Sequence, residues 1–194
     1  MMEIKNPYTG VAYGAFLETP LDQIGDVLKA AHKAHYAISG PERARILRKF
    51  AERLSADKGL KEVCAITITH ESGLALKDTL YEVERVIETA KAAALVAERI
   101  DEATTHRSLL NKQTPVGAKL TVLTEPLDLV VGITPFNHPM NQVAHKVFPA
   151  IAAGASIVLK PSEKTPLSAL LLQKLLSEAG LPENLFTIVI NHNI

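Results

Sequence analysis

The fold of this chain is decided by residues 129–190, which read LVVGITPFNHPMNQVAHKVFPAIAAGASIVLKPSEKTPLSALLLQKLLSEAGLPENLFTIVI. Three short apolar runs alternate with two stretches that suit helices: 129–134, 140–153, 155–160, the residues after Thr165-Pro166, and 185–190. Strands that are apolar throughout and separated by helices are typical of a parallel sheet covered on both faces. The stretch therefore predicts a β-α-β-α-β core, in which Gly180 ends the second helix.

The helices of this core have predictable inward faces. In the second helix, the spacing of the leucines predicts that Leu167, Leu170, Leu171 and Leu175 face inward. In the first helix, His145 follows Asn141 by one turn, and we expect it to pack beside the sheet.

The first hundred residues indicate a mostly helical region. Thr19 can cap a helix that begins at Pro20, and Pro41 can open a second. A third is expected over residues 60–70, and a fourth, with a long apolar stripe, over residues 78–100. Polar residues 101–116 lack apolar periodicity and indicate a connector. Residues 119–124 then predict a strand that forms one arm of a ribbon pairing elsewhere.

Composition excludes several classes of function. Lys plus Arg equals Asp plus Glu at 21 each, so no net field favours nucleic acid or an anionic membrane surface. No apolar stretch reaches the roughly 20 residues of a bilayer span, and the N-terminus does not resemble a secretory signal. We therefore expect a cytoplasmic protein without nucleic-acid or membrane partners. A single cysteine excludes an internal disulfide framework.

A ligand site is expected where the first two strands of the core end. In open parallel sheets, ligands bind at the carboxyl ends of the strands, because loops and helix starts converge there. The first strand ends in Thr134-Pro135-Phe136-Asn137-His138-Pro139, where the prolines either stiffen a binding loop or simply end the strand and begin the helix. The second strand ends in Lys160-Pro161-Ser162-Glu163, which offers a donor and an acceptor to a ligand or a solvated surface pair. The usual glycine-rich phosphate loops are absent from the sequence.

Four ordered blocks carry a family resemblance. They run over residues 131–139, 146–154, 158–166 and 178–182, and they resemble successive blocks of the aldehyde dehydrogenase family. The likeness extends to the N-terminal helices through Glu71-Ser72-Gly73 and Glu82-Val83-Glu84. Among its members, the chain looks nearest to those that handle lactaldehyde-like or phosphonate-bearing aldehydes. The resemblance implies an α/β protein with a helical N-terminal region, a partial Rossmann-like parallel sheet and an oligomerisation-type strand.

The resemblance assigns roles to both loops. The residue matching Asn137 donates its side-chain amide to the oxyanion formed when a cysteine thiolate attacks the aldehyde, and losing such a donor typically costs about 10²–10³ in rate. The residues matching Lys160 and Glu163 hold the adenosine ribose of the nicotinamide cofactor. The remaining positions expected to contact the cofactor are Ile133, Thr134, Pro135, Phe136 and Ser162.

The cofactor is expected to be NAD or NADP. Lys160 suits either a ribose hydroxyl or a 2′-phosphate, but Glu163 would repel the phosphate and favours NAD. His138 stands where many relatives carry an aromatic residue. We hypothesise that it faces the substrate entrance and helps to select a small polar or anionic aldehyde; the alternative is a histidine bonded to backbone at the start of the helix.

The resemblance also implies parts that this sequence does not carry. The family mechanism needs a catalytic thiolate, a carboxylate that activates water and a glycine-rich turn near the cofactor. Cys64 is expected to be a small buried residue in a helix rather than that thiolate. His32 and His35 lack a third ligand in the sequence pattern, so we expect them to be surface or packing residues and no metal to bind. The sequence thus predicts an N-terminal part of such an enzyme that is inactive alone.

Four segments are expected along the chain. They are a helical part of the cofactor-binding domain at 1–118, a bridging or oligomerisation strand at 119–126, the β-α-β-α-β core at 127–190 and an atypical tail at 191–194. A homo-oligomer is expected for the full-length family and is left open here. The alternative function is a non-catalytic interaction module that joins full-length subunits through the strand at 119–124 and an exposed sheet edge.

Overall fold

A computed structural model describes residues 1–35, 37–100, 104–107, 120–123 and 125–192. The helices are the short 3-10 turn Leu21–Gln23, α1 (Ile24–Ala34), α2 (Gly40–Ala56), α3 (Lys58–Ser72), α4 (Leu76–Arg99), α5 (Pro139–Ala153) and α6 (Leu167–Ala179). The strands are β1 (Met2–Lys5), β2 (Ala12–Phe16), β3 (Thr104–Arg107), β4 (Leu120–Leu123), β5 (Leu129–Ile133), β6 (Ser156–Lys160) and β7 (Phe186–Ile188). No helix in these ranges is long and apolar enough to cross a membrane.

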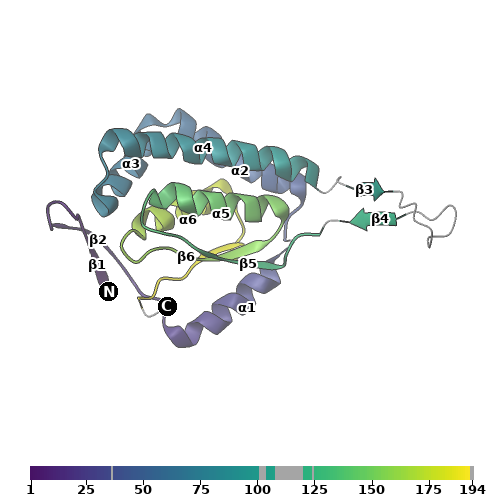
Figure 1. The fold of residues 1–194 in the computed structure, drawn as a ribbon, viewed down its shortest axis with the longest axis horizontal. Helices are drawn as coiled ribbons and strands as arrows, with labels where there is room; N and C mark the ends of the chain where they lie inside the picture. The colour runs from purple at the N-terminus through teal and green to yellow at the C-terminus, as the bar shows by residue number, and fades with distance from the viewer. Residues whose placement is uncertain (36, 101–103, 108–119, 124, 193–194) are drawn as a thin grey trace.

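The predicted β-α-β-α-β core is confirmed. Strands β5, β6 and β7 lie in that order, and both pairs are parallel. The sheet has α1 on one face and α5 with α6 on the other, while α2, α3 and α4 form a further layer outside α5 and α6 (Figure 1). Gly180 has φ +106° and ends α6 in the left-handed conformation, as predicted. This arrangement brings the carboxyl ends of β5 and β6 to one edge of the sheet.

The predicted inward face of α6 is only partly correct. Leu175 is buried and Leu171 packs against the main core, as predicted, but Leu172 and Leu176 are the fully buried leucines of the helix. Leu167 and Leu170 instead pack against a second apolar cluster formed by Ile4, Phe16 and Ile190. The difference arises because α6 packs against two apolar clusters, so leucines on more than one of its faces are covered.

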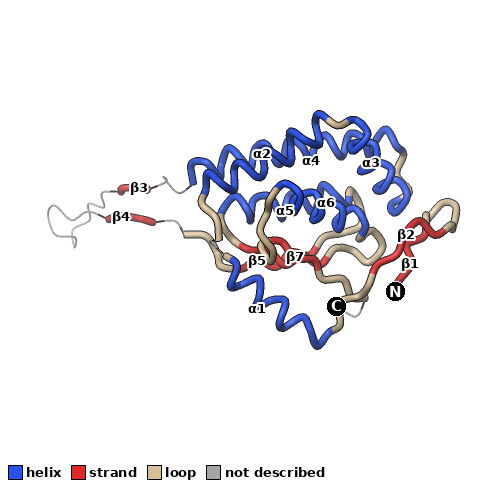
Figure 2. Tube along the Cα trace, turned by 180° about the vertical axis from the view of Figure 1, so that it is seen from behind, coloured by secondary structure: helices blue, strands red, loops and turns tan. Residues whose placement is uncertain are grey.

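An N-terminal hairpin, β1–β2, supplies that second cover and lies in a region expected to be mostly helical. The two strands pair antiparallel, with Met2 opposite Phe16. Tyr13 stacks on His70 of α3 with 4.2 Å between ring centroids. The hairpin lies at the end of the molecule opposite β3 and β4 (Figure 2).

The predicted start of the first helix is wrong. Residues after Pro20 form the 3-10 turn before α1 begins at Ile24. Thr19 does not cap a helix: its Oγ1 accepts a hydrogen bond from the Ile190 amide at 3.2 Å, and its own amide donates to the Ile190 carbonyl at 2.7 Å. A contact distant in sequence has thus taken the hydroxyl that local pattern assigned to a cap.

The predicted strand at 119–124 is present as β4. Its partner is β3, paired antiparallel, which lies within the segment expected to be a plain connector. Lys119 and Thr124, at the two ends of the prediction, are outside the described residues. The ribbon arm therefore pairs with a neighbouring segment of the same chain.

Candidate functional site

The two loops singled out in the sequence lie side by side. The Thr134 amide, directly after β5, donates to the Lys160 carbonyl at the end of β6, with 3.1 Å between nitrogen and oxygen. The register of the sheet pairs Ile133 with Lys160 and explains why the two strands end together. The strand-end rule therefore located one continuous edge rather than two separate places.

The loop after β5 presents several groups to the outside. Ile133 and Phe136 are 69% and 54% exposed, and Asn137 is also exposed. The Lys164 ammonium lies 5.1 Å from the centre of the Phe136 ring, which is within range of a cation–π contact. Thr134, in contrast, is buried. The loop thus offers an aromatic face and an amide at the surface above a buried strand end.

The loop after β6 carries paired charges. The Lys160 ammonium lies 3.5 Å from Oε2 of Glu163, and its side chain is only 14% exposed, against 44% for Glu163. A backbone hydrogen bond within Glu163, followed by the charge of Lys160, lowers the pKa of the Glu163 carboxyl below its ordinary value. The hydroxyl of Ser162 accepts a hydrogen bond from the Lys164 amide. At neutral pH the loop therefore holds an ionised acceptor beside a partly buried donor.

A buried carboxylate from α4 holds the start of α5. Oε1 of Glu82 accepts hydrogen bonds from the Met140 and Asn141 amides at 2.9 and 3.0 Å. Its Oε2 lies 3.2 Å from Nδ1 of His138, whose φ of +49° is left-handed. Burial raises the pKa of the Glu82 carboxyl above its ordinary value, although the hydrogen bonds from these donors lower it. His138 therefore bonds a carboxylate rather than backbone, and its proposed role in selecting the aldehyde stays a prediction.

Glu71 of α3 does the same for α6. Its two carboxylate oxygens accept hydrogen bonds from the Leu167 and Ser168 amides at 2.7 and 3.0 Å. Burial raises the pKa of Glu71 to about 7, although the contacts with Ser168 and Leu167 lower it. Both glutamates were missed as site residues in the sequence. Their signal was an acid on a helix face that otherwise carries buried residues, such as Thr79 and Val83 beside Glu82.

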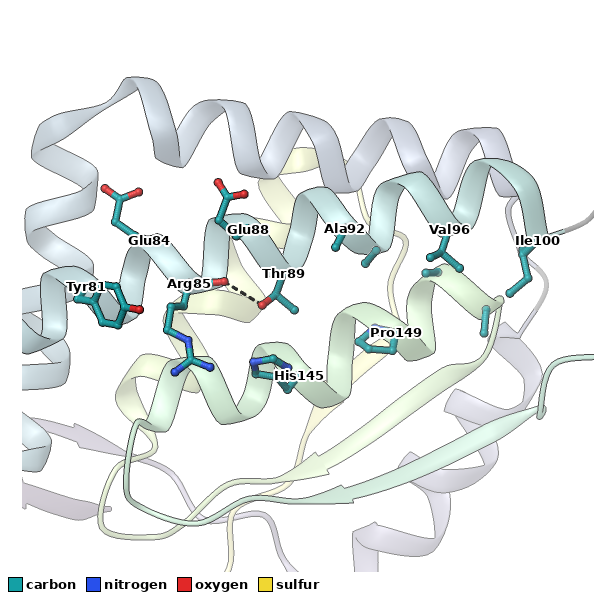
Figure 3. Close-up of a pocket in the computed structure, with 13 residues that line it drawn as sticks. Tyr81, Glu84, Arg85, Glu88, Thr89, Ala92, Val96, Ile100, His145 and Pro149 are labelled. Atoms are coloured by element: carbon teal, nitrogen blue, oxygen red, sulfur yellow. Dashed lines mark hydrogen bonds between the residues drawn. The ribbon is translucent and has the colours of Figure 1, made fainter.

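A groove of about 640 Å³ runs between α4 and α5. Its wall is mostly apolar, with Val96, Ile100 and Pro149 at one end, while Arg85 and His145 lie near each other at the other (Figure 3). The predicted packing of His145 beside the sheet is wrong. The side chain is exposed in the groove because the neighbouring positions Val143, Ala144, Val147 and Phe148 take the buried faces of α5.

The acids of this groove have other partners. Glu84 pairs with Lys61 at 2.6 Å and Glu88 with Lys91 at 2.8 Å. Within the described part of the chain, no ion pair involves Arg85. The groove therefore joins an apolar channel to a cation that is open to an anionic ligand.

The predicted nature of Cys64 is confirmed. Its side chain is fully buried in α3, and burial raises the pKa of its thiol to about 12. A thiolate nucleophile at this position is excluded by that environment.

His32 and His35 approach a carboxylate from a distant segment. Their Nε2 atoms lie 3.4 and 3.5 Å from the two oxygens of Asp128, and the His32 side chain is 57% exposed. Over the ranges that the structure covers, no three or more His, Cys, Asp or Glu side chains are grouped so as to hold a metal ion.

Comparisons with known proteins agree with the resemblance. A sequence family described as "Aldehyde dehydrogenase family" matches residues 1–193. Aspartate-semialdehyde dehydrogenase 1 of Pseudomonas canavaninivorans is 36% identical over 191 residues, which cover 96% of this chain and 39% of that protein. The chain thus spans about two fifths of the length of this curated relative.

Solved structures show the same relation. Aldehyde dehydrogenase 21 of Physcomitrella patens, in complex with the reaction product succinate, is 33% identical with a TM-score of 0.87 and is matched over 99% of this chain and 40% of its own. NADP-dependent glyceraldehyde-3-phosphate dehydrogenase from Bacillus halodurans C-125, complexed with NADP, is 29% identical with a TM-score of 0.86 over 97% of this chain and 39% of its own. The match over residues 1–193, together with a fold shared along nearly the whole chain, shows that this protein belongs to the aldehyde dehydrogenase family.

Proposed function

We propose that this chain supplies the cofactor-binding part of an NAD(P)-dependent aldehyde dehydrogenase, an oxidoreductase that converts an aldehyde to a carboxylate. The observation that carries the proposal is the hydrogen bond from the Thr134 amide to the Lys160 carbonyl. It joins the loop that presents Asn137 to the loop that presents Lys160 and Glu163. In this proposal, one edge of the sheet carries both the oxyanion donor Asn137 and the pair that holds the ribose, Lys160 and Glu163.

The residues present suit a nicotinamide dinucleotide. The mostly buried Lys160 side chain offers a hydrogen-bond donor, and the ionised, more exposed Glu163 offers an acceptor. The two hydroxyls of a ribose can bind one of each. The exposed residues Ile133, Pro135 and Phe136, on either side of the buried Thr134, offer backbone and an aromatic face to the rest of the cofactor. Ser162 adds a hydroxyl to the same loop. When bound, such a cofactor accepts a hydride.

The side-chain amide of Asn137 is neutral at all ordinary pH values. We assign to it the donation of a hydrogen bond to the oxygen of the aldehyde as negative charge develops there, because a neutral donor stabilises an oxyanion without itself exchanging protons. Cys64 cannot form the covalent bond to the aldehyde, since its thiol is buried and protonated. We therefore expect no turnover of aldehydes by the 194-residue chain alone.

Cofactor binding tests this proposal directly. The ¹⁵N-labelled chain is titrated with NAD and with NADP, and amide resonances are followed by NMR. We expect shifts at Thr134, Phe136 and Lys160, and their loss in Lys160→Met but not in the exposed control Lys174→Ala. If the shifts occurred only in other parts of the chain, or if neither cofactor caused any shift, the proposal would be refuted.

The charge of Glu163 sets the expected preference between cofactors. An ionised carboxylate beside the ribose repels a 2′-phosphate, so NAD is expected to bind more tightly than NADP. Glu163→Gln is expected to narrow this difference, because the charge is lost while an acceptor remains. An unchanged ratio of the two dissociation constants would contradict the assignment.

We further propose that the aldehyde is anionic and that its acid group lies near Arg85 in the groove between α4 and α5. Support comes from the cation open to ligands in a mostly apolar channel, and from relatives named for a semialdehyde and for a succinate product. His138, half exposed at the start of α5, is proposed to help this selection. Titration with succinate should shift the resonances of Arg85 and His145 in the unchanged chain. In Arg85→Gln the resonances of His145 should not shift. Equal shifts in both proteins would count against it.

The second candidate is a non-catalytic interaction module. It is favoured by strand β5, whose one described neighbour is β6 and which exposes Val131 and Ile133 at 62% and 69%. An unpaired apolar strand can accept a strand from another chain. Pull-down with an intact dehydrogenase, and its loss in Val131→Lys, would support this function, whereas a strictly monomeric chain would exclude it.

A further inference from the structure

The side-chain amide of Asn137 must be held in a fixed orientation if it is to donate to an oxyanion. An oxyanion donor is effective only when it is held within about 0.5 Å and 10–20° of its working geometry. Asn137 lies on an exposed loop between β5 and α5, so its own surroundings hold it weakly. At one end, the loop is fastened to β6 through Thr134 and Lys160. The other end, one residue after Asn137, is fastened by a side chain from a different layer of the molecule.

That side chain is Glu82, which is only 1% exposed. Both of its oxygens are used: Oε1 accepts from the Met140 and Asn141 amides, and Oε2 faces Nδ1 of His138 at 3.2 Å. These are the free amides of the first turn of α5, where a negative charge is favoured. His138, which occupies the N-cap position, makes no side-chain cap bond of its own. Glu82 therefore replaces the local cap of this helix.

The same contact accounts for a strained backbone conformation. His138 has φ +49°, a left-handed value that costs a residue with a side chain on the order of 1 kcal/mol or more. Pro139 follows it and fixes the first φ of the helix. The contact with Glu82 holds the imidazole of His138, and the conformation of His138 sets the direction in which Asn137 enters the helix.

We propose that Glu82 is a positioning residue for Asn137, which it orients by capping α5 and by holding His138 in its left-handed turn. The inference rests on the proposed function, because only there does Asn137 act on an oxyanion. Glu82 itself touches neither aldehyde nor cofactor in this assignment. It lies 55 positions before Asn137 in the sequence, on helix α4.

The chain offers a matched control for a merely structural role. Glu71 also caps its helix by accepting two amides, although it uses one carboxylate oxygen for each, whereas Glu82 accepts both on Oε1. It is buried to a similar degree, at 4% exposed. Replacing Glu71 by Gln removes the charged cap of α6 but keeps the hydrogen bonds of Glu82 at the start of α5. A variant at either position that merely loosens the fold would affect both regions.

The first measurement follows the Asn137 side-chain amide by NMR as pH is changed. The titratable groups that act on Glu82 from the segments packed around it are His138 and Glu71. We expect the Asn137 resonances to shift with a midpoint above the ordinary pKa of a glutamate in the wild-type chain and in Glu71→Gln. The shift should be smaller in His138→Asn, where only the cap of α5 remains, and absent in Glu82→Gln. His138→Asn retains a residue that tolerates the left-handed turn while removing the imidazole.

The second measurement is hydrogen exchange at the Met140 and Asn141 amides. Replacing an ionised acceptor by a neutral one should speed their exchange about tenfold in Glu82→Gln, since hydrogen bonds to charged groups are worth about 1.5–3 kcal/mol. Exchange there should be unchanged in Glu71→Gln. An Asn137 titration that survives in Glu82→Gln, or that disappears equally in Glu71→Gln, would overturn the proposal. Neither readout involves a cofactor, so failure of NAD to bind would refute the proposed function without producing either of these results.

Discussion

Glu71 is almost fully buried between α3 and the start of α6, and burial raises its pKa to about 7 from an ordinary value of 4.5. A rise of this size corresponds to about 3 kcal/mol, at roughly 1.4 kcal/mol for each pKa unit. Between the two pKa values the folded chain binds a proton that the unfolded chain releases. The free energy of unfolding therefore falls as pH rises from about 4.5 to about 7, and the loss is complete above the folded pKa.

The perturbation that isolates this effect is Glu71→Gln. Glutamine cannot ionise, so the variant lacks this part of the pH dependence. It also has one oxygen for two amide donors, which should lower its stability by a constant amount at every pH. The stability of the variant relative to the wild type is thus expected to rise by about 3 kcal/mol between about pH 4.5 and about pH 8.

Urea unfolding followed by circular dichroism, repeated at several pH values, measures this difference. Other titrating groups are common to both proteins and cancel when the two curves are subtracted. Glu62→Gln, an exposed position on the same helix, serves as the control and should run parallel to the wild type. Parallel curves for Glu71→Gln as well would refute the reasoning that the buried carboxyl titrates in this range.

Three further predictions concern the core. Phe148→Ala is expected to lower the free energy of unfolding by about 3–5 kcal/mol in urea titrations, because the ring is fully buried against Phe50 at 5.3 Å between centroids. Gly154→Ala should cost about 1–2 kcal/mol in the same assay, since φ is +95° and a Cβ would lie 3.2 Å from the Arg43 guanidinium; an unaltered midpoint would contradict this. Cys64 should resist iodoacetamide in the native chain and react after unfolding, as detected by mass spectrometry, because its buried thiol stays protonated.

The core and the edge that carries the candidate site were predictable from the sequence. Strand β6 is buried along four of its five residues, so its apolar run had one consistent structural meaning. Because neighbouring parallel strands end together, the position of Thr134 beside Lys160 followed from the same pattern. The regular geometry of parallel sheets, rather than any single residue, made the core and this edge predictable.

The hairpin β1–β2 was not predictable in the same way. Among its nine strand residues only Ile4 and Phe16 are buried, so no alternating pattern marks it. Its stability depends on Leu167 and Leu170, which lie more than 150 positions later in the chain than Phe16. Local sequence cannot reveal a strand whose apolar partners are supplied by a distant helix.

The buried glutamates were missed for a related reason. A glutamate is normally an exposed residue, and its burial is stabilised only when donors satisfy both oxygens. For Glu82 those donors lie 56 to 59 positions away, at His138, Met140 and Asn141. A single sequence contains no sign of this pairing, and for the same reason the bond that holds His138 could not be anticipated.

The positions of Glu71 and Glu82 in the chain bear on the order in which the molecule is assembled during synthesis. Each lies earlier in the chain than the helix it caps, by 96 and 58 positions respectively. During synthesis from the N-terminus, α3 and α4 are therefore made before α5 and α6, and their carboxylates are in place when the later amides emerge. If the sheet segment came first in the chain, the amides at the starts of α5 and α6 would be synthesised before their acceptors. In this chain the acceptors are synthesised first.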